Sequence, residues 1–141
     1  MVSLNLTQSQ LSRLIELLYL GEWMRQAHNK DTYDVEIENL EQALFQAAYN
    51  EGLDDLVEYD NKLGGYVPSE ELEEKCDAHI EQYDDQTFWE ELIVRLAQKK
   101  LEKQKNTLLS SKELEKLQSS FISEYEKEFE AHGLNRLDIK P

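Results

Sequence analysis

Helix-start motifs occur three times in this chain of 141 residues and constrain its fold more than any other feature. In each motif, a Ser or Thr stands three positions before a Gln or Glu. The two side chains can then bond the free backbone N–H groups of a helix's first turn. The motifs are T-Q-S-Q, T-F-W-E and S-S-K-E, and they begin at Thr7, Thr87 and Ser110. Apolar residues at helical spacing follow each one, which predicts helices over 7–28, 87–104 and 110–132.

Two further helices are predicted between the first two motifs. An apolar stripe at helical spacing predicts a helix over 33–51, ended by Gly52. Ser69, followed by acids that suit a helix's first turn, predicts another over 69–83. The stretch LDDLVEYDNKLGGYVPS between them contains Gly64-Gly65 and is interpreted as a short helical turn and a loop. No alternating apolar and polar run is long enough to predict a convincing strand.

The fold class that follows is all-α, a single-domain bundle of about five helices over 1–141, with 133–141 as a tail. A chain of this length suits one domain. The composition, with 40% hydrophobic and 32% charged residues, is ordinary for a globular protein and not typical of disorder. Only two prolines occur, and neither interrupts a predicted helix.

Acidic charge is concentrated in the middle of the chain. The formal net charge is −15, and residues 51–90 hold fourteen Asp and Glu against two Lys. Residues 91–141 are close to balance, with ten Lys and Arg against nine acids. Phosphate backbones repel a protein of this charge, so the sequence predicts no direct binding of nucleic acid. A protein partner with a basic surface is the partner that this charge favours.

The helix predicted over 69–83 has two distinct faces when its residues are placed 100° apart. One face is expected to be buried and consists of Leu72, Cys76, His79, Ile80 and Tyr83. The opposite face is Glu70, Glu74, Asp77 and Glu81, which we call the acidic face. Two interpretations stay open for it: the solvated side of an amphipathic helix, or a docking surface for a basic partner. Its carboxylates, about 5 Å apart along the axis, also suit mimicry of a nucleic-acid backbone.

The acids of this region resemble a known enzyme pattern. Glu70-Glu71-x-x-Glu74 followed by Glu81-x-x-Asp84 resembles the EExxE and ExxD pair of the all-α nucleoside-triphosphate pyrophosphatases of the MazG type. The resemblance covers fifteen residues and implies Mg²⁺ held between two facing helices. Here the gap between the motifs is shorter than in that family, and both fall on one predicted helix. A Mg²⁺-dependent nucleotide hydrolase is therefore an alternative function.

Other catalytic and metal-binding patterns are weaker. Cys76 and His79 stand three apart and could share a zinc ion with His28 or His132, but a small buried Cys is the commoner explanation. No Gly-x-Ser-x-Gly or phosphate-binding glycine loop occurs. We therefore predict no catalytic, cofactor-binding or metal-binding residues and no cofactor.

Two other places are candidate sites. The apolar residues of the first predicted helix move from one face of the helix to another near Gly21. Four residues at this point are predicted to line a pocket: Glu22, Trp23, Arg25 and His28. Glu22 and Arg25 are three apart and can form an ion pair. Phe45 and Tyr49 lie off the main stripe of the second helix. Two interpretations stay open for them: an exposed aromatic patch, or burial by packing of the five helices.

The sequence thus predicts a non-enzymatic protein-interaction or regulatory module, with self-association into a homo-oligomer as one form of that function. The lone Cys76 excludes an internal disulfide and fits a reducing cytoplasm. A bacterial, cytoplasmic protein is the expectation. The first residues lack the pattern of a signal peptide, and no apolar run is long enough to cross a membrane. The hydrolase and the nucleic-acid mimic remain the two alternatives.

Overall fold

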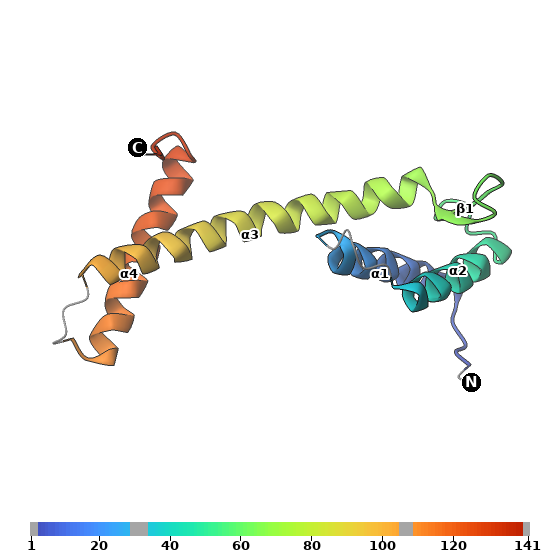
Figure 1. Cartoon of the computed structure of the whole chain (residues 1–141), viewed down its shortest axis with the longest axis horizontal. Coiled ribbons are helices and arrows are strands. Elements are labelled where there is room, and N and C mark those ends of the chain that lie inside the picture. Colours follow the sequence, from blue (N-terminus) through green and yellow to red (C-terminus); the bar gives the residue numbers. More distant parts are fainter. Residues whose placement is uncertain (1–2, 29–33, 105–108, 140–141) are drawn as a thin grey trace. The chain divides into compact units, whose positions relative to one another are not determined.

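The computed structural model describes residues 3–28, 34–104 and 109–139. Within these ranges the chain forms four helices and one two-stranded antiparallel sheet (Figure 1). Their order is α1 (Gln8–Gln26), α2 (Val35–Asn50), β1 (Val57–Asp60), β2 (Gly65–Pro68), α3 (Glu70–Gln104) and α4 (Ser111–His132). The mostly helical prediction is confirmed, although the described helices number four rather than about five. None of these helices is both long and apolar enough to pass through a lipid bilayer.

Two of the three helix-start motifs form the predicted caps. The Thr7 hydroxyl accepts a hydrogen bond from the Gln10 N–H at 3.2 Å, and Gln10 Oε1 accepts one from the Thr7 N–H at 2.9 Å. Ser110 and Glu113 repeat the arrangement at the start of α4. The bond from the Ser110 hydroxyl, followed by the bond from its backbone N–H, lowers the pKa of the Glu113 carboxyl.

The third motif, at Thr87, does not start a helix. The helices predicted over 69–83 and 87–104 are one continuous helix, α3, and the prediction of a break between them is wrong. Ser69 is its cap as predicted, since Ser69 Oγ accepts a bond from the Leu72 N–H at 3.1 Å. Asp84, Asp85 and Thr87 are poor helix formers, but none is Gly or Pro. A continuous helix satisfies their backbone groups internally, which a break would not.

The segment interpreted as a helical turn and loop is instead a β-hairpin, so the expectation of no strand is wrong. Tyr59 of β1 pairs with Tyr66 of β2, and Asp60 pairs with Gly65. Asp60 Oδ1 accepts bonds from two N–H groups of the turn, and Gly64 follows with φ of +69°, a conformation that glycine adopts without strain. The two strands have only four residues each, which is too short for a clear alternating pattern.

Contacts within the chain fall into two units, Met1–Gln82 and Tyr83–Pro141, which we call the N-unit and the C-unit. Residues 70–82 of α3 belong to the N-unit, and residues 83–104 belong to the C-unit. Each unit has its own apolar cluster and is described by itself. The assignment of 1–141 to a single domain remains a prediction.

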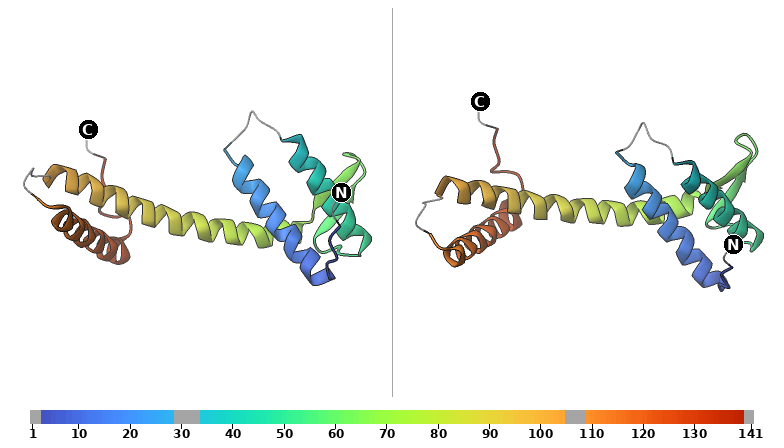
Figure 2. Two further views of the ribbon diagram at one scale, coloured as in Figure 1. Left: turned by 90° about the horizontal axis from the view of Figure 1, so that it is seen from below. Right: turned by 60° about the horizontal axis from the view of Figure 1, so that its bottom comes forward.

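The N-unit core is enclosed by α1, α2, the hairpin and the start of α3. Figure 2 shows α1 and α2 lying side by side, with the hairpin against α2. Phe45 is completely buried in this core, which decides between the two interpretations of this residue in favour of burial. The hairpin covers the Phe45 side of α2 and leaves Leu40, a member of the predicted stripe, 53% exposed. The buried residues are Leu11, Ile15, Phe45, Ala48, Leu56, Val57, Leu72 and Cys76.

The C-unit core lies between α4 and the second part of α3. Ala97 and Leu101 of α3 pack with Phe121 of α4, and partly buried residues of α4 surround them. Aromatic rings extend the contact, because the Trp89 ring lies 5.6 Å from the Phe129 ring, centroid to centroid. Gly133 ends α4 as predicted, with φ of +53°.

Candidate functional site

The acidic face lies on the first turns of α3, where the opposite side of the helix is fixed in the N-unit core. Leu72, Cys76 and Ile80 are buried as predicted, whereas His79 and Tyr83 are exposed, which corrects the predicted buried face. Leu72 and Cys76 belong to the N-unit core, whereas Tyr83 belongs to the C-unit. All four acidic-face residues, Glu70, Glu74, Asp77 and Glu81, are exposed.

Lys75, the only Lys or Arg in the stretch 70–81, is held by α1. Its Nζ donates to Glu16 Oε1 at 2.5 Å, and Arg13 Nη1 donates to Glu16 Oε2 at 2.9 Å. Burial opposes ionisation of Glu16, but the bonds from Lys75 and Arg13 outweigh it and lower the pKa of this carboxyl. Lys75 therefore pairs with Glu16 of α1 and not with the acids of the acidic face.

The acids that resemble the hydrolase pattern do not converge. Glu70, Glu71, Glu74, Glu81 and Asp84 are all exposed and all lie on α3. Across the described residues, no group of three or more His, Cys, Asp and Glu is arranged to hold a metal ion. Catalysis by bound cations needs ligands that meet around the ion.

The residues considered for a zinc site, Cys76 and His79, are also not placed to bind one metal ion together. Cys76 is buried in the N-unit core, while His79, three residues later, is exposed. Burial, followed by the negative charge of Glu16, raises the pKa of the Cys76 thiol. A raised pKa disfavours the thiolate, which is the form that binds metals and attacks electrophiles.

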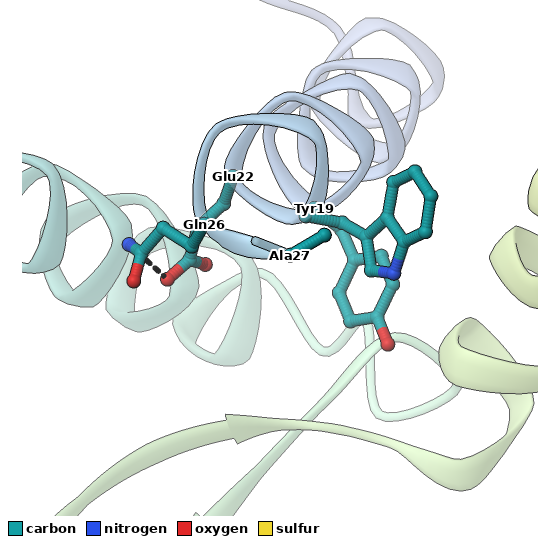
Figure 3. A pocket seen from close by; sticks show the side chains of 5 residues that line it. Tyr19, Glu22, Gln26 and Ala27 are labelled. Carbon is teal, nitrogen blue, oxygen red and sulfur yellow. Dashed lines mark hydrogen bonds between the residues drawn. The ribbon is translucent and has the colours of Figure 1, made fainter. Parts of the chain in front are cut away.

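The last two turns of α1 line a cavity of about 320 Å³, which we call the α1 pocket. Its lining residues are Tyr19, Glu22, Trp23, Gln26 and Ala27, and Figure 3 shows these side chains along one stretch of the helix. Glu22 and Trp23 were predicted to line a pocket, and they do so. Arg25 and His28, the other predicted members, are not among the lining residues and are exposed.

The predicted partner of Arg25 also differs from the observed one. Arg25 Nη2 donates to Asp34 Oδ2 at 3.3 Å, and Asp34 is the residue that caps α2. Glu22 Oε1 instead accepts a bond from Gln26 Nε2 at 3.1 Å, drawn as a dashed line in Figure 3. The bond between Arg25 and Asp34 therefore ties the end of α1 to the start of α2.

A second carboxyl meets Glu22 from the neighbouring helix. Glu41 of α2 and Glu22 of α1 are both partly buried. Burial, then a side-chain interaction with Glu22, then the charges of Glu22 and Glu38 raise the pKa of Glu41 to about 8.

Sequence reasoning missed Glu41, although the chain carries a signal for it. Glu41 stands at helical spacing within the apolar series Ile37, Leu44 and Ala48, at the position where another apolar residue is expected. An acid on an otherwise apolar stripe is a candidate for a perturbed pKa.

Gln42 was also missed. Its side chain donates to the Tyr66 carbonyl at 2.7 Å and accepts from the Tyr66 N–H at 2.9 Å. A Gln side chain thereby pairs with the backbone of β2 much as another strand would. No sequence signal marks this contact, because it depends on the hairpin reaching α2.

Comparison with known proteins finds no matching family model, no matching curated protein and no matching solved structure. Function is therefore argued from the residues of this chain.

Proposed function

We propose that this protein is a non-enzymatic interaction module that binds a protein partner with a basic surface through the acidic face of α3. The observation that carries the proposal is the acidic face itself. Four carboxylates stand in water on a helix whose other side is fixed by buried Leu72 and Cys76. A rigid charged surface loses little conformational entropy on binding.

The engagement of Lys75 with Glu16 strengthens this proposal. A Lys on the same helix could neutralise the neighbouring acids by pairing with them at helical spacing. Instead its ammonium group lies 2.5 Å from a carboxylate of α1. The surplus charge steers a basic partner toward the acidic face, and salt weakens such steering.

The experiment is a pull-down with three baits. The first bait is the wild-type chain. The second is the acidic-face variant, in which Glu70, Glu74 and Glu81 are changed to Gln and Asp77 is changed to Asn. The third is a matched control in which four exposed acids of the C-unit, Glu90, Glu115, Glu126 and Glu130, are changed to Gln. Salt is set at about 50 mM and about 300 mM, which brackets physiological screening.

The proposal expects a protein bound by the wild type and the control, absent from the acidic-face variant, and weakened at the higher salt. Equal binding by all three baits, or equal loss from both variants, contradicts it. The control separates a specific surface from a general effect of net charge.

Self-association is a second candidate function, favoured by apolar side chains in the C-unit part of α3. Tyr83, Phe88 and Val94 are large and exposed there, and such residues anchor interfaces between proteins. Light scattering on the purified chain tests it, since a dimer exceeds the chain mass of 16.6 kDa. A monomer at the highest attainable concentration rejects it.

A further inference from the structure

We propose that three tyrosines of the N-unit, Tyr49, Tyr59 and Tyr66, form a docking surface for an arginine side chain of a basic protein segment. We call these residues the tyrosine cluster. The cluster is built from α2 and the hairpin, whereas the acidic face lies on α3. The inference therefore goes beyond the function proposed for the acidic face and does not depend on it.

The tyrosine cluster joins three elements at the contact between the hairpin and α2 (Figure 2). Tyr59 of β1 and Tyr66 of β2 are paired across the two strands, and their ring centroids lie 5.1 Å apart with 69° between the ring planes. The Tyr49 ring of α2 lies 5.4 Å from the Tyr66 ring, at 50°. Tyr66 thus contacts both other rings, and Gln42 holds its backbone by two hydrogen bonds.

Packing of the hairpin does not by itself account for the exposure of these rings. Tyr66 is partly buried against the N-unit core, but Tyr49 is 42% exposed and Tyr59 is 43% exposed. Val57, two residues before Tyr59 on the same strand, shows what a purely internal contact looks like, because it is 1% exposed. A contact between two rings covers at most one face of each ring. Tyr49 and Tyr59 therefore keep aromatic surface in water.

The charge of the surrounding chain selects a cation for this surface. The face of an aromatic ring carries partial negative charge and attracts a cation placed over it. Residues 51–68, which include the whole hairpin, contain five Asp and Glu against one Lys. Four of these acids are exposed, namely Glu51, Asp54, Asp55 and Glu58. The rings and the acids thus favour the same kind of occupant, and an acidic segment would be repelled.

Arginine suits this surface better than lysine. The C-unit already contains a cation over aromatic rings, since Lys100 Nζ lies 4.6 Å from the centre of the Phe121 ring and 5.7 Å from that of Tyr125. That lysine is held in place by its own chain, whereas an occupant from another molecule must first give up water. A guanidinium group is less strongly hydrated than an ammonium group, and its planar shape stacks on a ring while its edge still donates hydrogen bonds.

The test uses two end-blocked hexapeptides of equal charge, one alternating Gly and Arg and the other alternating Gly and Lys. Each is titrated into the chain with carbon-13 in its tyrosine rings, at about 150 mM salt. The ring signals of the tyrosine cluster are expected to shift with the arginine peptide and to shift less with the lysine peptide. Tyr83 is an internal control, because it is 54% exposed among acids of α3 but belongs to the C-unit. Equal shifts at Tyr83, or equal effects of the two peptides, overturn the inference, because general attraction between charges would then explain them.

Two changes at Tyr59 separate the ring from its bulk. Tyr59→Leu is expected to weaken binding of the arginine peptide about two- to fivefold, the usual strength of a cation–ring contact at an exposed site. Tyr59→Phe keeps the ring and is expected to bind as the wild type does. Loss of binding in both variants, or in neither, overturns the inference. The acidic-face variant is expected to keep the ring shifts. Their disappearance from that variant would place the peptide on α3 and would also overturn the inference, whatever the result of the pull-down.

Discussion

The N-unit and the C-unit close their apolar cores in different ways. In the N-unit, two helices, a hairpin and the start of α3 surround Phe45, Ile15 and Leu72, whose side chains are completely buried. In the C-unit, α4 packs against a single stretch of helix, and of the buried residues that the structure describes there, Ala97 alone reaches zero exposure. Several elements can enclose an interior, whereas two helices leave one side of each open to water.

The two units also differ in the charged neighbours of their half-buried ionisable side chains. The N-unit sequence has eighteen acids against five Lys and Arg, and the C-unit sequence has twelve against ten. In the C-unit, Lys100 bonds to Glu124 at 2.6 Å and lies 4.6 Å from the centre of the Phe121 ring. In the N-unit, burial, followed by the neighbouring acids Glu22 and Glu38, raises the pKa of the half-buried Glu41 carboxyl.

The largest expected effect on stability comes from removing the buried Phe45 ring from the N-unit core. Phe45→Ala should reduce the free energy of unfolding by about 3–5 kcal/mol, because it leaves a cavity where a completely buried ring stood. Urea denaturation followed by Trp23 emission in the Trp89→Phe background measures the change in the N-unit. A loss below about 1 kcal/mol would contradict the central position of Phe45.

Phe121→Ala applies the same change to the C-unit. We expect a loss of about 2–4 kcal/mol, smaller than for Phe45, because two packed helices collapse around a cavity more readily than an enclosed core. Trp89 emission in a Trp23→Phe background reports this unit. If Trp23 emission shifts equally in the Trp89→Phe background, the two units unfold together and the comparison between them fails.

The ends of the helices were largely predictable from the sequence because capping is a local interaction. Thr7 with Gln10, Ser110 with Glu113, and Ser69 before Leu72 act over three residues, so the sequence contains the whole interaction. Thr87 shows the limit of this reasoning. The same spacing occurs inside α3, where the backbone N–H groups already have helical partners and no cap is needed.

The hairpin and the carboxyl pair depend on contacts that are distant in sequence. Four-residue strands have little pattern of their own, and β2 is held in part by Gln42, twenty-four positions away. The hairpin also packs against α2, where Phe45 is completely buried and Leu40, a member of the predicted apolar stripe, is 53% exposed. Glu41 was visible as an acid on an apolar stripe, but its partner Glu22 could be found only once α1 and α2 were placed side by side.

The contact between the hairpin and α2 offers a test of intermediate size. An added Cβ at Gly65 would lie 3.0 Å from Gln42 Oε1, so Gly65→Ala should displace the amide that bonds to Tyr66. We expect a loss of about 1–2 kcal/mol, since two partly buried hydrogen bonds are strained. Gly21→Ala is the control, because nothing lies within 4 Å of its added Cβ.

Gly21 is in the interior of α1, where Ala should raise stability by about 0.5–1 kcal/mol. The two glycine changes should therefore have opposite signs in urea denaturation followed by Trp23. Equal effects of both would show that the bond from Gln42 to Tyr66 does not hold the hairpin.

The smallest expected effect concerns the ion pair that engages Lys75. Glu16→Gln should reduce the free energy of unfolding by about 0.5–1 kcal/mol at neutral pH, the usual range for a partly exposed pair. The pKa of Glu16 is lowered in the folded chain, so its stabilisation is present above the ordinary carboxyl value and is lost as the pH falls through the folded pKa. The wild type and the variant should therefore converge in urea denaturation at acidic pH. Glu91→Gln, which removes an exposed bond to Arg95, should have less effect at either pH. A difference for Glu16→Gln that is the same at acidic and neutral pH would mean that packing, rather than charge, connects α3 to α1 here.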